Sequence, residues 1–217
     1  GDGVVLVGHP GGGLLGGLYA LRRPEKLSAW LPVSQMVDFK RSEQVSAAEA
    51  IRRAREAGRE KDAERLAQEL EQVLALRRLD RAGAGALLRF RRRKERYLPP
   101  QYGGPCPLGG LAAPELTGND LRWKLRLDRM LAANAALYEE LLGGLSLDGC
   151  PPRYGVPVIL TAGERDWTTP YPLAAAYYDT LSAPCKVFLS LPDAGHLPFR
   201  ERPEEWSHIL LDALAQI

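Results

Sequence analysis

Cysteine is scarce in this chain, with three in 217 residues: Cys106, Cys150 and Cys185. They are widely spaced, and no Cys-x-x-Cys pair or Cys/His cluster accompanies them, so a structural zinc site is not expected. An odd number of separated cysteines is typical of free thiols in a reducing compartment. We therefore predict a cytoplasmic location.

Long apolar runs and an excess of one charge sign are also missing. No apolar run approaches the roughly 18 residues of a membrane-spanning helix, and no basic segment followed by an apolar one indicates a secretion signal. Lys and Arg number 29 against 27 Asp and Glu, a formal net charge of +2, which gives no general attraction to nucleic acid or to an anionic membrane. We predict neither as a partner. Because the chain begins with Gly1 rather than Met, we expect it to be part of a longer product.

A serine is missing from the turn where the sequence most suggests chemistry. The turn Gly8-His9-Pro10-Gly11-Gly12 follows the apolar run Val4-Val5-Leu6-Val7 and precedes a glycine-rich apolar stretch. A strand, a sharp glycine turn and a helix are the setting of the nucleophile elbow Gly-x-Ser-x-Gly. Here the glycine spacing is kept, but the nucleophile position holds Pro10, which has no hydroxyl, thiol or carboxylate and whose ring holds φ near roughly −65°. The spacing therefore predicts an elbow without an attacking group.

Short strands alternate with helices on both sides of a long helical block, which predicts an α/β sheet interrupted by a helical insertion. Residues 4–7 are expected to form a buried strand, because they are apolar and mostly β-branched without alternation. We expect a core made of residues 1–37 and 149–217 and a helical lid at residues 38–148. The predicted core elements are strands 4–7, 27–34, 156–161 and 186–191 and helices 13–21, 171–181 and 203–217.

The helical block is rich in Ala, Leu, Glu and Arg, which are good helix formers. Ser46 and Glu49 have the spacing of a capping box, which predicts a helix start there. Gly58 is expected to break the following stretch into two helices, and a further helix is expected over residues 120–142.

An acid and a histidine follow two of the later predicted strands. Asp166 ends the segment Gly163-Glu164-Arg165-Asp166 after strand 156–161, and His196 follows Gly195 after strand 186–191. Open α/β sheets place functional groups at the carboxyl ends of their strands. Asp166 could accept a hydrogen bond from one imidazole nitrogen of His196 and leave the other as a general base. Each residue alone is more often structural, and their order after the elbow is what favours catalysis.

These three turns resemble the α/β-hydrolase superfamily, and most closely its proline iminopeptidase-like branch. The resemblance rests on Leu6 to Gly12, on Gly163 to Asp166, and on Ala194 to Phe199 followed by Arg202-Pro203-Glu204. It implies the C-terminal part of a mostly parallel α/β-hydrolase sheet with a helical cap. It also implies a Ser-His-Asp hydrolase of peptides, esters or amides without metal or cofactor, in which Asp166 is the acid, His196 the base and Gly11 an oxyanion-hole amide.

The chain departs from this family in two ways. Pro10 stands at the position of the serine, and among its neighbours only His9 could attack, although His9 points elsewhere in the family's geometry. Loss of a triad nucleophile removes a factor of about 10⁶ in rate. Family members also carry several strands before the elbow strand, whereas three residues precede Val4 here. We therefore expect an exposed sheet edge at strand 4–7, and a chain that is marginal alone or needs an N-terminal half or an oligomer partner.

Two tryptophans are candidates for a substrate pocket. Trp167 directly follows Asp166 and is expected in the pocket wall. Trp123 belongs to an apolar stripe with Leu127, Met130 and Leu131, which could line a pocket beneath the lid or dock the helix onto its neighbour.

Three functions remain open from the sequence. The first is a hydrolase acting on a small-molecule or peptide substrate, with acyl transfer to water impaired by the missing serine. The second is a non-catalytic remnant or binding module of the same fold. The third, nucleic-acid binding, rests on the basic run from Arg89 to Arg96, which holds a single aromatic residue. A solvated helix face is the favoured interpretation of that run.

Overall fold

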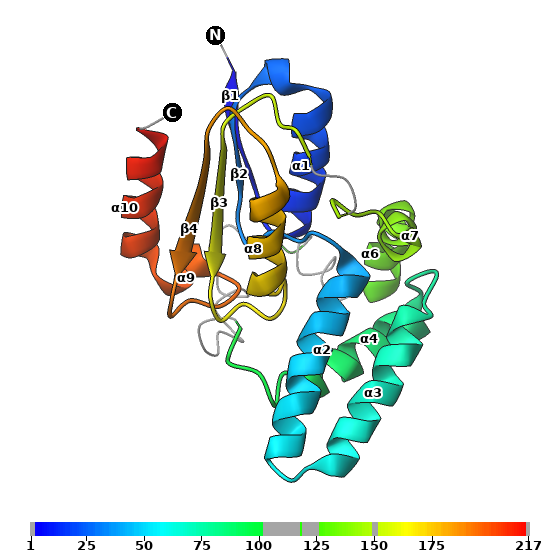
Figure 1. The fold of residues 1–217 in the computed structure, drawn as a ribbon. Helices are drawn as coiled ribbons and strands as arrows, with labels where there is room; N and C mark the ends of the chain where they lie inside the picture. Colours follow the sequence, from blue (N-terminus) through cyan, green and yellow to red (C-terminus); the bar gives the residue numbers. More distant parts are fainter. Residues whose placement is uncertain (1–2, 102–117, 119–125, 149–151, 216–217) are drawn as a thin grey trace. The chain divides into compact units, whose positions relative to one another are not determined.

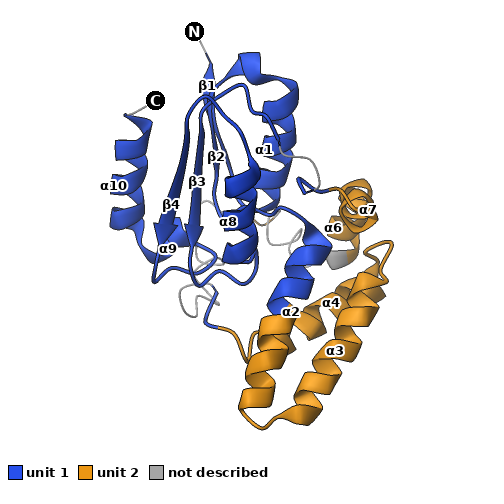
Figure 2. Ribbon diagram, viewed as in Figure 1, with its two compact units in different colours: residues 1–46, 99–103, 146–217 blue, residues 47–98, 104–145 orange. Residues whose placement is uncertain are grey.

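The computed structural model describes residues 3–101, 118, 126–148 and 152–215 of the chain (Figure 1). The chain divides into two units, one of residues 1–46, 99–103 and 146–217 and the other of residues 47–98 and 104–145 (Figure 2). Every described strand belongs to the first unit, and the described part of the second is helical. The boundary falls within α2 (Phe39–Glu56), so the first residues of the predicted lid belong to the sheet unit.

A four-stranded parallel sheet forms the centre of the first unit. Its strands follow one another in sequence order, as β1-β2-β3-β4, and each neighbouring pair is parallel. The carboxyl ends of all four strands therefore lie along one edge of the sheet, where functional groups are expected. The α/β fold class predicted from the sequence is confirmed. The strands are β1 (Val4–Gly8), β2 (Leu27–Pro32), β3 (Val158–Gly163) and β4 (Lys186–Leu191).

Helices cover both faces of this sheet (Figure 1). On one face, α1 (Gly11–Arg22) approaches the indole of Trp30 closely, because a Cβ at Gly16 would lie 2.9 Å from its Nε1. The ring of Tyr154 lies 4.9 Å from that of Trp30 in a tilted arrangement, and its hydroxyl hydrogen-bonds to Tyr177 of α8 (Tyr171–Thr180). On the other face, α10 (Pro203–Leu214) buries Ala213 against Leu31 and Ile159. The short helices η1 (Pro24–Lys26) and α9 (Pro198–Glu201) precede β2 and α10.

The strand expected at residues 4–7 is present as β1, but the expectation that it is buried is wrong. Val4, Val5 and Val7 are 61%, 43% and 55% exposed. Among the described strands β1 pairs only with β2, so its other side is a free edge. Leu6 is half-buried beside Gly16 of α1. An apolar run without alternation predicts burial only where the sheet continues on both sides, and the described sheet stops at β1.

The second unit is built from helices that pack through small and apolar side chains. It contains the later part of α2, α3 (Glu60–Leu74), α4 (Arg81–Lys94), α6 (Leu127–Ala133) and α7 (Ala135–Gly143). The helix break predicted at Gly58 is confirmed, since this glycine lies between α2 and α3 with φ +68°. The buried apolar side chains of α3 and α4 are Ala63, Leu66, Val73, Ala84, Leu87 and Phe90.

Two helix boundaries predicted from the sequence are wrong. Ser46 does not cap a helix, because it lies inside α2 and its Oγ donates to the carbonyl oxygen of Ser42 at 2.8 Å. The Asp38 carboxylate, which accepts from the N–H of Arg41 at 2.7 Å, stands at the start of α2 instead. The helix expected over 120–142 is two helices in its described part, since α6 and α7 separate at Asn134. The Asn134 side chain donates to the carbonyl oxygen of Met130 at 2.8 Å, a local bond that competes with helix continuation.

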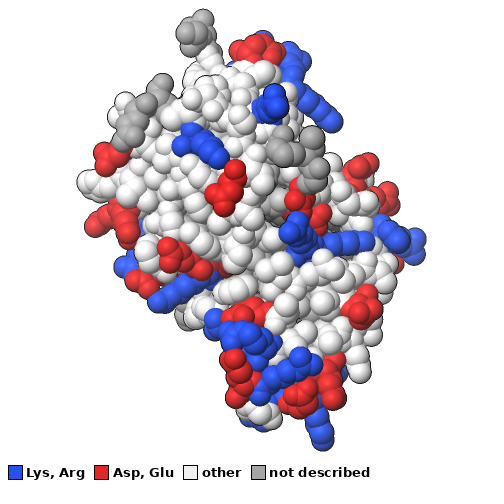
Figure 3. All heavy atoms as spheres, viewed as in Figure 1, with Lys and Arg blue, Asp and Glu red and all other residues white. Residues whose placement is uncertain are grey.

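Charged side chains of both signs are interspersed on the face shown in Figure 3. Within the basic run of α4, Arg93 pairs with Glu69 at 3.0 Å, and Lys94 is 4% exposed. The interpretation of this run as a solvated face therefore holds only in part. None of the described helices combines the length and the apolar character needed to cross a bilayer.

Candidate active site

The turn after β1 has the compact geometry of an elbow. Gly8 ends β1, and a Cβ added there would lie 2.3 Å from the carbonyl oxygen of Gly12, so a larger residue does not fit without movement. Pro10 is the N-cap of α1, with φ −68° and ψ −43°. Its carbonyl oxygen accepts from the N–H of Leu14 at 3.2 Å. Position 10 thus has helical backbone and no attacking group. Gly11 opens the helix, and the N–H groups of Gly12 and Gly13 donate to the carbonyl oxygens of His9 at 3.2 Å and Pro10 at 3.1 Å.

The carboxylate of Asp166 is completely buried in the loop after β3. Its Oδ1 accepts from the N–H groups of Thr168 and Thr169, both at 2.9 Å, and its Oδ2 accepts from Thr169 Oγ1 at 2.8 Å. A buried charge is costly unless such donors compensate it. Gly163 brings this loop against the next one, because a Cβ there would lie 2.3 Å from the carbonyl oxygens of Ala194 and Gly195.

The imidazole of His196 meets this carboxylate. Nδ1 of His196 lies 2.9 Å from Oδ2 of Asp166, and the histidine is 4% exposed. A carboxylate only accepts hydrogen bonds, so Nδ1 carries the hydrogen, and the tautomer of the neutral ring is set. The N–H of His196 donates to the carbonyl oxygen of Gln101 at 2.9 Å, and its own carbonyl accepts from Ser34 Oγ at 3.1 Å. The structure thus brings the two predicted residues together.

His9 joins the elbow turn to the histidine loop. Its ring lies 4.6 Å from that of His196 and 5.3 Å, edge-on, from that of Phe199. Its Nε2 lies 2.8 Å from the carbonyl oxygen of His196, and because a carbonyl only accepts, Nε2 carries the hydrogen. Burial lowers the pKa of His9 below its usual value. The elbow, the acid and the histidine therefore converge at one edge of the sheet.

Sequence reasoning missed the residues that hold these loops in place. Ser34 follows β2, is fully buried and has a positive φ of +47°, and its carbonyl oxygen lies 3.0 Å from Thr169 Oγ1. Glu201 binds the histidine loop from the other side, because its carboxylate accepts from the N–H groups of Gly195 at 2.7 Å and Leu197 at 3.0 Å. Ser34 could have been found as a polar residue shortly after a strand, and Glu201 as an acid shortly after His196.

Gln101 was missed for a different reason. It stands in a stretch rich in Pro and Gly that shows neither helical nor strand periodicity. In the structure its side chain is 4% exposed and contacts the acid loop, where its Oε1 accepts from the N–H of Trp167 at 2.5 Å. No pattern in the sequence connects residue 101 with residues 166 and 196.

The sequence pattern of the family described as "Alpha/beta hydrolase family" matches residues 1–208. The match spans well over half of the chain, and the parallel sheet and its three converging turns fit it. The chain belongs to the alpha/beta hydrolase family. No curated protein matches it.

Solved structures share the fold of this hydrolase-family chain at low sequence identity. VinJ is 19% identical with a TM-score of 0.56, over 99% of this chain and 66% of VinJ. The proline iminopeptidase of Mycobacterium smegmatis is 18% identical with a TM-score of 0.54, over 99% of this chain and 66% of its own. The epoxide hydrolase of Bacillus megaterium, solved with an inhibitor, is 16% identical with a TM-score of 0.52, over 99% and 70%. The hydrolase-family chain therefore spans about two thirds of their length, and the likeness establishes its fold.

The structure describes only one of the two tryptophans predicted to line a pocket. Trp167 is half-buried directly after Asp166, and its place in a pocket wall stays a prediction. Trp123 lies outside the described residues. From the same predicted stripe, Leu131 is buried and Met130 half-buried.

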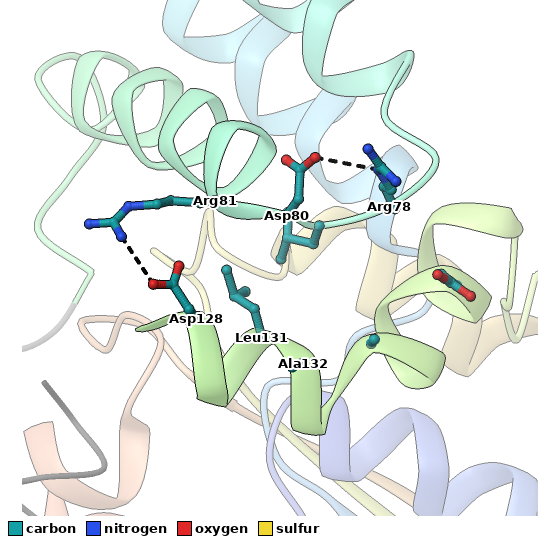
Figure 4. Close-up of a pocket in the computed structure, with 9 residues that line it drawn as sticks. Arg78, Asp80, Arg81, Asp128, Leu131 and Ala132 are labelled. Atoms are coloured by element: carbon teal, nitrogen blue, oxygen red, sulfur yellow. Dashed lines mark hydrogen bonds and ion pairs between the residues drawn. The ribbon is translucent and has the colours of Figure 1, made fainter. Parts of the chain in front are cut away.

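A cavity of about 310 Å³ lies within the second unit (Figure 4). The start of α4 and the helices α6 and α7 line it, and it shares no residue with the Asp166–His196 pair. Its rim carries two ion pairs, Arg81 with Asp128 at 3.0 Å and Arg78 with Asp80 at 3.4 Å. In the part of the chain that the structure describes, no group of three or more His, Cys, Asp or Glu side chains is placed to hold a metal ion.

Proposed function

We propose that this chain is a hydrolase of the proline iminopeptidase or esterase type in which acyl transfer to water is impaired. The hydrogen bond of 2.9 Å between buried Asp166 and His196, beside the elbow turn, is the observation that carries the proposal. Asp166 orients the imidazole, His196 acts as the general base, and the N–H of Gly11 donates to the developing oxyanion. The substrate is a small peptide, amide or ester, and no cofactor takes part.

Pro10 removes one step from this chemistry. A serine at this position would attack the substrate carbonyl and form an acyl-enzyme, but proline has no group that can do so. Only direct attack by a water molecule that His196 deprotonates remains. Triad enzymes that lack a member keep a residual acceleration of roughly 10³–10⁴ over water from binding and the oxyanion hole. We expect activity of that order at most.

Hydrolysis of 4-nitrophenyl acetate by the purified chain tests this proposal. We expect slow turnover that His196→Ala abolishes and that His208→Ala, a change on exposed α10, leaves intact. Pro10→Ser should raise the rate, because it returns a hydroxyl to the elbow. Turnover that survives His196→Ala would show that the ester is cleaved elsewhere and would refute the assignment.

The second candidate is a non-catalytic binding module of the same fold. The helical backbone of Pro10 favours it, because a nucleophile in an elbow usually has a strained conformation. In that case the unaltered chain would bind an amide such as N-benzylacetamide saturably without any turnover that depends on His196. Saturable binding without such turnover would select this function over the impaired hydrolase.

We also infer that a polypeptide covers the free edge of β1. Val4, Val5 and Val7 expose apolar surface there, and a bare strand edge presents unpaired N–H and carbonyl groups that favour pairing. About a third of the chain of these solved relatives lies outside the part that this sequence matches. The polypeptide that fits this edge is the set of strands that precede the elbow strand in the family. Pairing with a second copy of this chain is the competing outcome.

Cys185 is free, and a reducing, cytoplasmic setting remains the proposed location.

A further inference from the structure

We propose that Gln101 is a positioning residue that sets the Asp166–His196 geometry by joining the acid loop to the histidine loop. The inference rests on the proposed acid–base role of that pair and assigns a function to a residue outside the three motif turns. Gln101 touches no reacting atom, so it acts through the acid loop and the histidine loop that it binds.

The two ends of Gln101 contact the two loops separately. Its side-chain Oε1 accepts from the N–H groups of Trp167 at 2.5 Å and Thr168 at 3.2 Å, in the acid loop. Its main-chain carbonyl accepts from the N–H of His196 at 2.9 Å. One residue therefore binds the segment on each side of the hydrogen bond between the carboxylate and the imidazole.

Gln101 and Asp166 share one hydrogen-bond donor, the N–H of Thr168. The N–H of Thr168 lies 2.9 Å from Oδ1 of Asp166 and 3.2 Å from Oε1 of Gln101. A shift of the Gln101 carboxamide therefore changes a donor on which the buried carboxylate depends. Because a displacement of about 1 Å can cost a catalytic site about 100-fold in rate, this coupling is large enough to matter.

The hydrogen bonds of Nε2 of Gln101 orient its Oε1. Nε2 of Gln101 donates to the carbonyl oxygens of Pro99 at 2.6 Å and Arg165 at 2.9 Å. These bonds show which end of the amide is the donor, and so they direct Oε1 towards Trp167 and Thr168. The role needs a side chain that donates and accepts at this length. Methionine has a similar shape without either amide function, and asparagine has both functions on a shorter stem.

Nuclear magnetic resonance of the unaltered chain provides the direct test, because it does not depend on turnover. A hydrogen held between an imidazole and a carboxylate resonates at unusually low field, and His196→Ala identifies that signal by removing it. We expect Gln101→Met to broaden the signal or shift it upfield in protein that is still folded. Gln72→Met changes an exposed glutamine on α3 and should leave the signal unchanged.

Gln101→Asn is the second variant in case Gln101→Met does not fold. It keeps an amide in the buried site but draws it back from the acid loop, so we again expect the low-field signal to broaden or shift upfield. A purely structural role would lower the unfolding midpoint of either variant and leave the signal of the folded protein as in the parent. That result would overturn the proposal.

Kinetics in the Pro10→Ser background separate positioning from binding. With 4-nitrophenyl acetate we expect Gln101→Met to lower kcat by about 100-fold while KM changes by less than about threefold, as for a residue that acts on catalytic geometry. An unchanged kcat would contradict the inference. If the Pro10→Ser background has no activity that depends on His196, the proposed hydrolase function fails, and the resonance experiment still decides the role of Gln101.

Discussion

His9 is held in the elbow turn by a hydrogen bond to the histidine loop and by burial. It sits in the elbow turn, where the sequence made it the one alternative nucleophile, but its Nε2 donates to the carbonyl oxygen of His196. Burial keeps its pKa below the usual 6.5. A base whose pKa is lowered by folding takes up protons more readily when unfolded, so the folded state loses stability as the pH falls below the unfolded pKa.

We therefore predict that His9 contributes to acid sensitivity. Between about pH 7 and pH 5 the free energy of unfolding should fall as His9 is protonated in the unfolded chain, and His9→Gln should make this fall shallower. Urea titrations at several pH values measure the slope. His208→Gln, on exposed α10, is the control and should keep the parent slope. Equal slopes in the parent and His9→Gln would refute the prediction.

The turn between β1 and α1 depends on one of its glycines far more than on another. A Cβ at Gly8 would lie 2.3 Å from the carbonyl oxygen of Gly12, whereas a Cβ at Gly12 would meet nothing within 4 Å. The two positions share the turn and differ in the space around them. Substitutions at the two positions therefore form a matched pair that tests how closely the end of β1 approaches the start of α1.

Gly8→Ala should destabilise the chain by about 1–3 kcal/mol, because the new methyl group forces the strand and the helix apart. Gly12→Ala should be neutral or stabilise the chain by up to about 1 kcal/mol, because alanine favours a helix over glycine. Urea unfolding of both variants against the parent measures the difference. Similar losses in both would mean that the close approach at Gly8 is absent.

The free edge of β1 is the second feature that belongs to the scale of elements. Val7 is 55% exposed there, and Leu211 on α10 is 65% exposed. Exposed apolar side chains on a strand edge favour pairing with another chain, whereas single exposed residues on a helix are ordinary.

We predict that Val7→Lys reduces self-association of the chain and that Leu211→Lys does not. A charge on an edge strand opposes pairing of strands between molecules. Static light scattering over a concentration series measures this for the parent and both variants. An equal effect of the two substitutions would show that β1 is not the surface through which molecules associate.

At the scale of the whole molecule, the described sheet of the first unit ends at β1, which pairs with β2 and with no other described strand. The solved relatives are about half as long again as the part that this chain matches in VinJ and in the Mycobacterium smegmatis proline iminopeptidase. A partner that binds only the folded state stabilises it by mass action. The free edge of β1 is where such a partner would act.

Adding the part of the Mycobacterium smegmatis proline iminopeptidase that this chain does not match should therefore raise the thermal midpoint of the chain. Differential scanning calorimetry with and without this segment measures the shift, and Val7→Lys should reduce it. A chain that is already highly stable and unaffected by the segment would refute the proposed partner. A midpoint that rises with the concentration of the chain alone would indicate self-association instead.

How much the sequence predicts varies with the range of the interaction. The strand at 186–191 was located within its observed bounds, because an apolar run between turn residues is a local signal. The helix start at Phe39 was missed, since Ser46 and Glu49 offered a stronger local pattern than the Asp38 cap. The prediction that residues 4–7 are buried is wrong, because burial depends on neighbouring strands that a local apolar run does not specify.

The amino-acid sequence alone specifies the order of strands and helices, the proline at position 10 of the glycine turn, and Asp166 and His196 as the candidate acid and base. Those features depend on residue type and on short spacings. Only the tertiary structure showed the 2.9 Å contact between the acid and the histidine, the link from His9 to the histidine loop and the position of Gln101 between them. These contacts join segments separated by 30 or more residues in the chain, and they form only because a parallel sheet brings the carboxyl ends of its strands to one edge.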